Sequence, residues 1–231
     1  GAGPGDPDLI TVKGNNLIRS ADLLIYAGSL VNPELVSRSP APDKYDSNGM
    51  SLEEMTPLMV QACRDGKTVV RLHSGDPALY GAIIEQMDLL KAEGISTEVV
   101  PGVSSLFGAA AVLQTQLTLR GVSESVIITR PAGKTLERDH ISEYSQHRET
   151  MAIFLGSDRL NDVVAKVSHP PGTPAVVIYH ATWPDQKIIR GTVGTIAQLA
   201  KDAGICRSAL LLIGEVFGEE LPGHVRSELY S

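Results

Sequence analysis

Three short loops carry the residue types that could bind a small polar ligand. Residues 1–7 (GAGPGDP) and 71–77 (RLHSGDP) share a Gly-Asp-Pro trio, and residues 100–105 (VPGVSS) place two hydroxyls after a Pro-Gly turn. Glycine lets a ligand approach the backbone closely, and serine hydroxyls with free N–H groups at a helix start bind polar groups. Asp76 either accepts from ligand hydroxyls or caps the following helix. These loops predict a site that uses mainly main-chain groups.

The first loop departs from the common nucleotide-binding motifs. Its glycines match the start of a dinucleotide-binding G-x-G-x-x-G motif, but Asp6 stands in place of the third glycine and two prolines disfavour an immediate helix. An ordinary turn is an equally good interpretation of this loop alone. The sequence has no G-x-x-x-x-G-K loop, G-x-S-x-G elbow or metal-spaced histidine pair, so kinase, hydrolase and metalloenzyme chemistry lack their usual residues. We expect no protein-bound metal.

The elements that position these loops follow an α/β pattern. Short β-branched runs alternate with longer helical stretches, as around parallel or mixed sheets. The predicted strands are residues 22–26, 68–72, 97–100, 125–129, 151–155, 175–179, 187–190 and 209–213. Two of the loops then follow strands, at the sheet edge where open α/β folds bind ligands.

Helices are predicted between most of these strands. Residues 78–93 show helical periodicity, with Gly94 as a C-cap, and the apolar run 103–113 indicates a buried helix. A further helix starts either at the capping box Ser51-x-x-Glu54 or with Thr56 as its cap and a proline in its first position.

Composition and charge indicate two domains and disfavour nucleic acid as a partner. The polar stretch 114–124 is the best linker candidate, which gives domains 1–118 and 119–231. The first has 8 basic and 14 acidic residues, net −6, and the second 12 and 13, net −1. The acidic excess and the 4% aromatic content argue against a nucleic-acid surface.

Cysteine usage and hydropathy point to a reducing compartment. Cys63 and Cys206 lie far apart, outside any metal-ligand spacing, and are expected to be buried free thiols. The sequence has neither an apolar stretch of about 18 residues nor a secretory signal, so we expect a cytoplasmic protein without membrane contact.

The three loops and two further stretches resemble the signature motifs of the tetrapyrrole methyltransferases, which use S-adenosylmethionine. The stretches occur in the family's order: GAGPGDPDLIT (1–11), RLHSGDPALYG (71–81), VPGVSS (100–105), MAIFLGS (151–157) and YHATWPDQKIIRGTVG (179–194). Within the family, YAGSLVNP (26–33), YDS (45–47) and SLEE (51–54) are similar to the precorrin-4 C11-methyltransferases of cobalamin synthesis. The family's uroporphyrinogen III methyltransferases usually carry an acid near Gly28, and its absence here favours the corrin branch.

The resemblance implies two α/β domains with a ligand cleft between them, commonly in a homodimer. The residues that it implies for binding S-adenosylmethionine are Pro4, Ser74, Gly75, Asp76, Leu79, Ser104, Ser105, Leu155, His180 and Ala181. A precorrin carries several carboxylates, which favour arginine and lysine partners. The candidates for binding this substrate are Arg71, Arg120, Arg130 and Lys134, although each alone is more often a solvated surface charge.

The implied reaction is methyl transfer from S-adenosylmethionine to C11 of precorrin-4. C11 becomes quaternary and loses no proton, so we predict no general base. Tyr45 and Asp46 are candidates for orienting the macrocycle, or else they are residues of an Asx-type turn. The alternatives are the same step on cobalt-precorrin-4, in the anaerobic route, methylation of an rRNA ribose, and a non-catalytic nucleotide-binding module.

Overall fold

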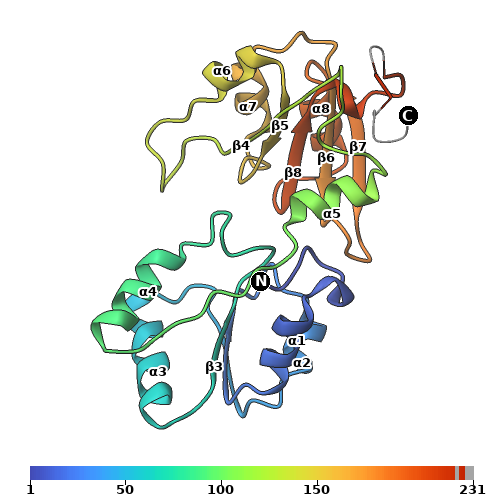
Figure 1. Cartoon of the computed structure of the whole chain (residues 1–231). Coiled ribbons are helices and arrows are strands. Elements are labelled where there is room, and N and C mark those ends of the chain that lie inside the picture. The colour runs from blue at the N-terminus through green and yellow to red at the C-terminus, as the bar shows by residue number, and fades with distance from the viewer. Residues whose placement is uncertain (222–223, 227–231) are drawn as a thin grey trace. The chain divides into compact units, whose positions relative to one another are not determined.

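The chain folds into two α/β units, Gly1–Phe107 and Gly108–Ser231. Figure 1 shows the computed structural model, which describes residues 1–221 and 224–226. The α/β class predicted from the sequence is confirmed. The division between the units falls within helix α5 (Ser105–Val112), whereas the sequence places it after residue 118.

The first unit is built on a three-stranded parallel sheet of order β2-β1-β3. Its strands are β1 (Leu23–Tyr26), β2 (Asp43–Asp46) and β3 (Val69–Leu72), and its helices are η1 (Pro7–Leu9), α1 (Val12–Arg19), α2 (Pro33–Ser37), α3 (Leu52–Arg64) and α4 (Ile83–Ala92). Leu24 packs with residues of α1 and α2, and its neighbours Leu23 and Ile25 pack with residues of α3 and α4. The alternation of side chains along β1 therefore separates two helical layers.

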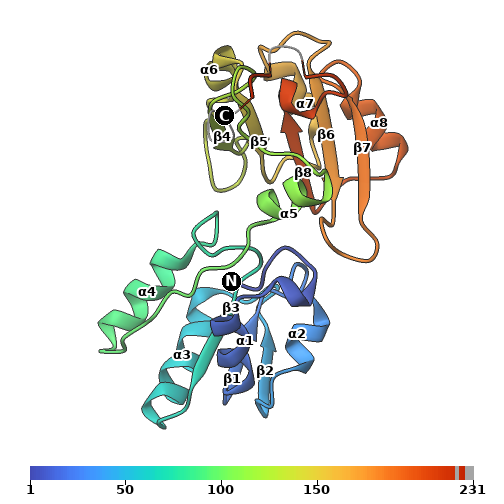
Figure 2. The same cartoon turned by 45° about the vertical axis from the view of Figure 1, so that its right-hand side comes forward.

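The second unit is built on a five-stranded mixed sheet of order β4-β5-β8-β6-β7. The strands are β4 (Val126–Thr129), β5 (Thr150–Ile153), β6 (Pro174–Tyr179), β7 (Lys187–Thr192) and β8 (Ala209–Ile213); β4 and β5 are parallel and the other pairs antiparallel. The helices are α6 (Ile141–Tyr144), η2 (Ser145–His147), α7 (Leu160–Lys166), α8 (Ile196–Asp202) and η3 (Glu215–Phe217). Ile153, Val177 and Leu211 of the sheet share a core with Val163 of α7 and Ile196 of α8. Figure 2 shows these two helices and the sheet in a second view.

Two predicted elements of the first unit are wrong. Residues 97–100 form no strand; together with residues of β3 they line a cavity of about 260 Å³. The helix predicted over residues 78–93 begins only at Ile83, because Tyr80 and Ala82 have left-handed backbone angles (φ +57° and +47°) that no α-helix accepts. The C-cap prediction is confirmed by the φ of +73° at Gly94.

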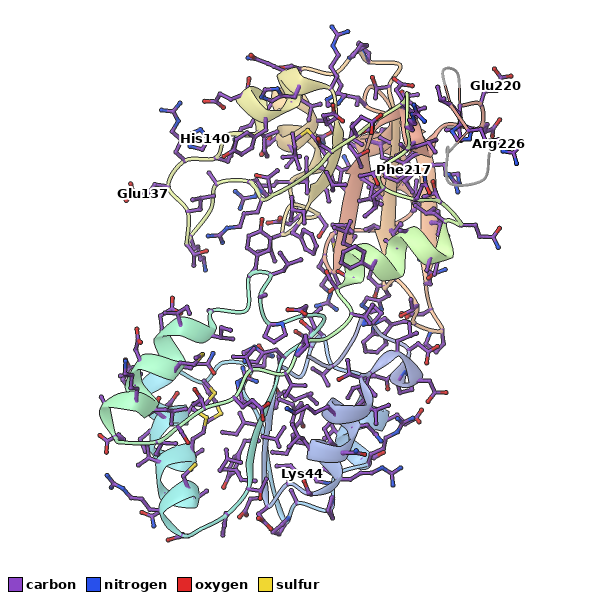
Figure 3. The ribbon with its side chains drawn as sticks, viewed as in Figure 1. Lys44, Glu137, His140, Phe217, Glu220 and Arg226 are labelled. Carbon is purple, nitrogen blue, oxygen red and sulfur yellow. The ribbon has the colours of Figure 1, made fainter. Side chains whose placement is uncertain are left out.

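Strand β2 is absent from the sequence prediction. All four of its residues, DKYD, are exposed, so the apolar signal of a buried strand is missing; one of them, Lys44, is labelled in Figure 3. Its pairing with β1 supplies the stabilisation that its composition does not indicate.

The capping box at Ser51 and Glu54 is confirmed, with both of its reciprocal hydrogen bonds present. The alternative start at Thr56 is wrong, because α3 begins at Leu52 and contains Pro57. Helix α5 is only partly buried: Leu106 is 1% exposed and Phe107 is 59% exposed.

Residues 114–124 are attached to the second unit rather than forming a linker. Ser123 Oγ accepts from both the backbone N and the Oγ1 of Thr150 at 2.9 Å, and Glu149 accepts from Ser123 Oγ at 2.8 Å. Thr150 Oγ1 also donates to Leu117 O at 2.8 Å. Both cysteines are free, but Cys63 is half-buried and Cys206 exposed, so the prediction that they are buried is wrong.

Candidate functional site

The three glycine-rich loops form one backbone assembly in the first unit. Ala2 N donates to His73 O at 2.7 Å, and Gly3 and Gly75 exchange two hydrogen bonds of 3.2 and 2.9 Å. A Cβ on Gly102 would overlap the carbonyl oxygen of Gly75, so glycine is required where the second and third loops meet. The convergence of the loops, which the sequence suggested, is therefore a feature of the fold.

Asp76 joins two of these loops through its carboxylate. Oδ1 accepts from Ala78 N at 2.7 Å, and Oδ2 accepts from Gly102 N at 3.0 Å. Asp76 does not cap a helix, because residues 77–80 form a turn and α4 begins later. Each carboxylate oxygen thus has a main-chain donor, and the side chain fixes the spacing between the loops.

The other predicted cofactor residues of the first unit lie on or beside this assembly. Ser104 is 4% exposed and its Oγ accepts from Leu106 N at 3.3 Å, while Ser105 begins α5. Leu79 lies in the turn after Asp76 and donates its N–H to Asp76 O at 3.2 Å. Pro4 is buried in the first loop, and Ser74 is half-buried beside Gly75.

Unusual backbone angles coincide with the predicted motifs. Among the described residues, eight non-glycine residues have a positive φ, and four of them lie in the motif stretches: Tyr80, Leu155, His180 and Thr182. Such conformations cost about 1–3 kcal/mol each and cluster at functional sites, although the other four of the eight lie outside the motif stretches. Leu155, at φ +55°, also leaves its side chain 59% exposed, which is unusual for leucine.

The loop after β6 holds an ordered histidine. His180 Nδ1 lies 3.0 Å from Asp185 Oδ1, and this hydrogen bond is the main cause that lowers the pKa of Asp185. The His180 ring stacks on Tyr179 at a centroid distance of 3.8 Å and lies 5.1 Å from the ring of Trp183. Ala181 beside it is buried. The imidazole is therefore held in one orientation.

Arg71, predicted to bind substrate, uses most of its hydrogen-bond donors on other groups of the protein. Its guanidinium makes four hydrogen bonds, to Gln86 Oε1, Ile25 O, Leu72 O and Ser47 Oγ, at 3.0–3.4 Å. Burial lowers its pKa, and the nearby carboxylate of Asp46 partly opposes that effect. Four of its five donors are used within the first unit.

Arg130 and Lys134 share one loop in the second unit, and Arg120 lies in an exposed turn of the same unit. Arg130 donates to the hydroxyl and the carbonyl oxygen of Thr135, at 2.7 and 3.0 Å. The end of this loop carries Glu137 and His140, labelled in Figure 3.

Asp139 anchors the same loop, and the sequence analysis missed it. Its side chain is 4% exposed and accepts from Lys166 Nζ and Ala132 N, both at 2.7 Å, and from Ile141 N at 3.3 Å. Burial opposes its ionisation, but these donors outweigh burial and lower the pKa of Asp139. Its position two residues before α6, a common place for a capping aspartate, was the available signal.

Asp46 lies at the carboxyl end of β2, beside the loop after β1. Its Oδ1 accepts from Gly28 N at 3.0 Å and from Asn48 N at 2.8 Å, so the Asx-type turn that the sequence left open is present. A Cβ on Gly28 would overlap the Asp46 carboxylate. Tyr45, the preceding residue of β2, is exposed and pairs with Ile25 of β1.

Neither a membrane-crossing helix nor a metal-binding cluster occurs in the part of the chain that the structure describes. None of its helices combines the length and apolar character needed to cross a membrane. No group of three or more His, Cys, Asp or Glu side chains within residues 1–221 and 224–226 is arranged to hold a metal ion.

Comparison with known proteins identifies relatives along the whole chain. A sequence model of the tetrapyrrole (corrin/porphyrin) methylases matches residues 1–197. A cobalt-precorrin-4 C(11)-methyltransferase of Methanocaldococcus jannaschii is 48% identical over 100% of this chain and 90% of its own length. A precorrin-4 C(11)-methyltransferase of Pseudomonas aeruginosa is 44% identical over 100% of this chain and 93% of its own.

Solved structures give the same result. A cobalt precorrin-4 methyltransferase, described as a cobalamin biosynthetic enzyme, has a TM-score of 0.90 and 45% identity, covering 94% of each chain. A uroporphyrin-III C-methyltransferase of Thermus thermophilus, solved with S-adenosyl homocysteine, has a TM-score of 0.80 and 26% identity, covering 93% of this chain and 95% of its own.

Proposed function

The chain belongs to the tetrapyrrole (corrin/porphyrin) methylases, and from this premise we propose that it transfers a methyl group from S-adenosylmethionine to C11 of precorrin-4 in cobalamin biosynthesis. One observation carries the proposal: relatives whose names specify methylation at this carbon are 44–48% identical over all of this chain. The five motif stretches lie within that matched length.

The loop assembly of the first unit fits S-adenosylmethionine. A Cβ on Gly1 or on Gly102 would overlap a neighbouring loop, so the loops meet backbone to backbone and we expect a ligand here to meet N–H and C=O groups. We assign cofactor contacts in the first unit to Pro4, Ser74, Gly75, Asp76, Leu79, Ser104 and Ser105. In the second unit we assign them to Leu155, His180 and Ala181.

This reaction requires the chain to position the two reactants rather than to supply a general acid or base at C11. S-adenosylmethionine supplies an electrophilic methyl group and leaves as S-adenosylhomocysteine with a neutral sulfur, so the positive charge passes to the macrocycle and is discharged by loss of a proton away from C11. C11 itself loses no proton when it becomes quaternary. Orientation of the two reactants and exclusion of water can therefore provide most of the acceleration. No protein-bound metal is part of this proposal.

The substrate's peripheral carboxylates need cationic partners. We assign this role to Arg130 and Lys134, whose loop Asp139 holds in place, and to Arg120. Arg71 remains a candidate, but its four internal hydrogen bonds favour a positioning role for the ends of β1 and β3. The resemblance also leads us to propose a homodimer, which sedimentation equilibrium can test.

The test is an anaerobic assay with S-adenosylmethionine carrying a ¹³C-labelled methyl group. The purified chain is expected to place one labelled methyl on C11 of precorrin-4, identified by mass and by ¹³C NMR of the product. Calorimetry is expected to show binding of S-adenosylhomocysteine and not of NAD. Absence of labelled product, or preferential NAD binding, would refute the proposal.

A second candidate is the same transfer to cobalt-precorrin-4. The relatives of M. jannaschii and Priestia megaterium, and the structure with a TM-score of 0.90, all carry that name. The same assay with the cobalt-bearing ring compares the two substrates, and a higher kcat/KM identifies the one that this chain prefers.

A further inference from the structure

Gly28 and Asp46 share one position at the carboxyl ends of two neighbouring strands. β1 and β2 run parallel with Tyr26 opposite Asp46, and the chain then turns through Gly28 on one side and Asn48 on the other. A Cβ on Gly28 would overlap all three atoms of the Asp46 carboxylate group. The carboxylate therefore occupies the space that a side chain at residue 28 would fill.

This carboxylate is fixed in orientation. Oδ1 accepts from two main-chain donors, Gly28 N at 3.0 Å and Asn48 N at 2.8 Å. The next residue, Ser47, donates both its backbone N–H and its hydroxyl to Tyr26 O, at 2.8 and 3.1 Å, and accepts from Arg71 Nη2 at 3.0 Å. A side chain held this way needs little reorganisation when it receives a ligand.

Within residues 1–221 and 224–226, the second oxygen of the carboxylate accepts no hydrogen bond, although the Arg71 guanidinium is close enough to interact with the carboxylate. Both hydrogen bonds that Asp46 receives within the described residues go to Oδ1, and the residue is exposed. An ionised carboxylate accepts hydrogen bonds and cannot donate them. It repels the peripheral carboxylates of a tetrapyrrole but attracts the ring N–H groups at the centre.

Resting on the proposed function, we propose that Asp46 Oδ2 accepts a hydrogen bond from a ring N–H of metal-free precorrin-4, and that Gly28 is a specificity-determining residue because it leaves room for this carboxylate. In cobalt-precorrin-4 the ring nitrogens bind the metal and carry no such proton. The hydrogen bond therefore acts on the metal-free ring alone. What matters is where the carboxylate lies, not which of the two residues carries it.

The variants Asp46→Asn and Gly28→Ala test the proposal in the full chain. Asp46→Asn keeps the size of the side chain but places an NH₂ group, which cannot accept a hydrogen bond, where Oδ2 lies. Gly28→Ala displaces the carboxylate. Both are expected to lower kcat/KM for precorrin-4 by about ten-fold to a hundred-fold, the range for losing a hydrogen bond to a charged group. The value for cobalt-precorrin-4 and the affinity for S-adenosylhomocysteine are expected to stay near wild type.

A double variant and a matched control sharpen the test. Gly28→Asp combined with Asp46→Gly moves the carboxylate to the other strand end and is expected to restore most of the activity on precorrin-4. Asp43→Asn makes the same chemical change at the opposite end of β2 and is expected to have no effect. Thermal unfolding of each variant confirms that it is folded.

The outcomes separate this inference from the proposed function. Equal losses on both macrocycles, a loss of S-adenosylhomocysteine affinity, or a folded double variant that stays inactive would each overturn the role of the carboxylate. So would an unchanged Asp46→Asn variant of an active enzyme. A wild-type chain that does not methylate precorrin-4, whether or not it acts on the cobalt-bearing ring, would overturn the proposed function, and this inference with it.

Discussion

Removing the Asp76 carboxylate is expected to weaken cofactor binding by separating two loops. Asp76→Ala deletes the acceptors of Ala78 N, at 2.7 Å, and Gly102 N, at 3.0 Å. Ala78 is exposed, so water can replace the first bond, whereas the half-buried Gly102 loses an acceptor that water replaces less well. An unsatisfied donor of this kind costs about 1–3 kcal/mol. If that loss falls on the bound state, the Kd for S-adenosylhomocysteine rises about five-fold to 150-fold.

Isothermal titration calorimetry with S-adenosylhomocysteine measures this effect. Asp76→Asn is the informative companion, because its amide oxygen can serve only one of the two donors and its NH₂ group faces the other. Asp65→Ala removes an exposed carboxylate that accepts from Gln61 at the end of α3 and serves as the control. If both Asp76 variants bind as tightly as the control, the loop assembly does not hold the cofactor and the reasoning fails.

Three further predictions concern stability and the substrate loop. Burial, with the charges of Arg71 and the N-terminus, lowers the pKa of His73 from 6.5 to about 4. Between these two pH values the unfolded chain binds a proton that the folded chain does not. The free energy of unfolding therefore falls by up to roughly 3 kcal/mol as pH drops from 6.5 to 4. Urea unfolding of His73→Gln should show a smaller pH dependence; a slope equal to wild type would contradict this. Ser123→Ala removes a shared buried partner and should cost about 1–3 kcal/mol in urea unfolding, whereas an unchanged midpoint would show that residues 114–124 are not anchored there. Arg130→Ala and Asp139→Ala should each raise KM for the macrocycle several-fold in steady-state assays without changing S-adenosylhomocysteine affinity, and a lower kcat at unchanged KM would argue against a substrate-binding loop.

The sequence predicted the parts of the fold that depend on local pattern. The buried strands β1, β5, β6 and β8 are apolar runs. The capping box at Ser51 is a local pattern whose residue types and spacing indicate the hydrogen bonds that the helix start makes. β2 could not be found this way, because its exposed residues are held by pairing with a distant strand. The late start of α4 depends on left-handed angles at Tyr80 and Ala82, which neither residue type indicates.

In the candidate site, too, the features set by local sequence were predictable and the contacts between distant residues were not. Glycines and short polar residues marked the three loops, and the structure shows that they meet. The partners of individual carboxylates were not predictable, because Asp76 contacts Gly102 and Asp46 contacts Gly28 across 26 and 18 residues of chain. Sequence spacing identifies a residue near the site, but only the fold shows whether its charge faces the protein or a ligand.

Most of the charged side chains in the candidate site form hydrogen bonds with other groups of the protein. Asp76 and Asp139 use both carboxylate oxygens, and Arg71 uses four of its donors. Such groups hold backbone in place and have little capacity left to transfer a proton. A methyl transfer that creates a quaternary carbon needs no proton transfer at that carbon, so a rigid site of this kind suits it. Asp46 differs, because both hydrogen bonds that it receives within the described residues go to Oδ1. It is therefore the carboxylate in these loops that we propose for contact with the substrate.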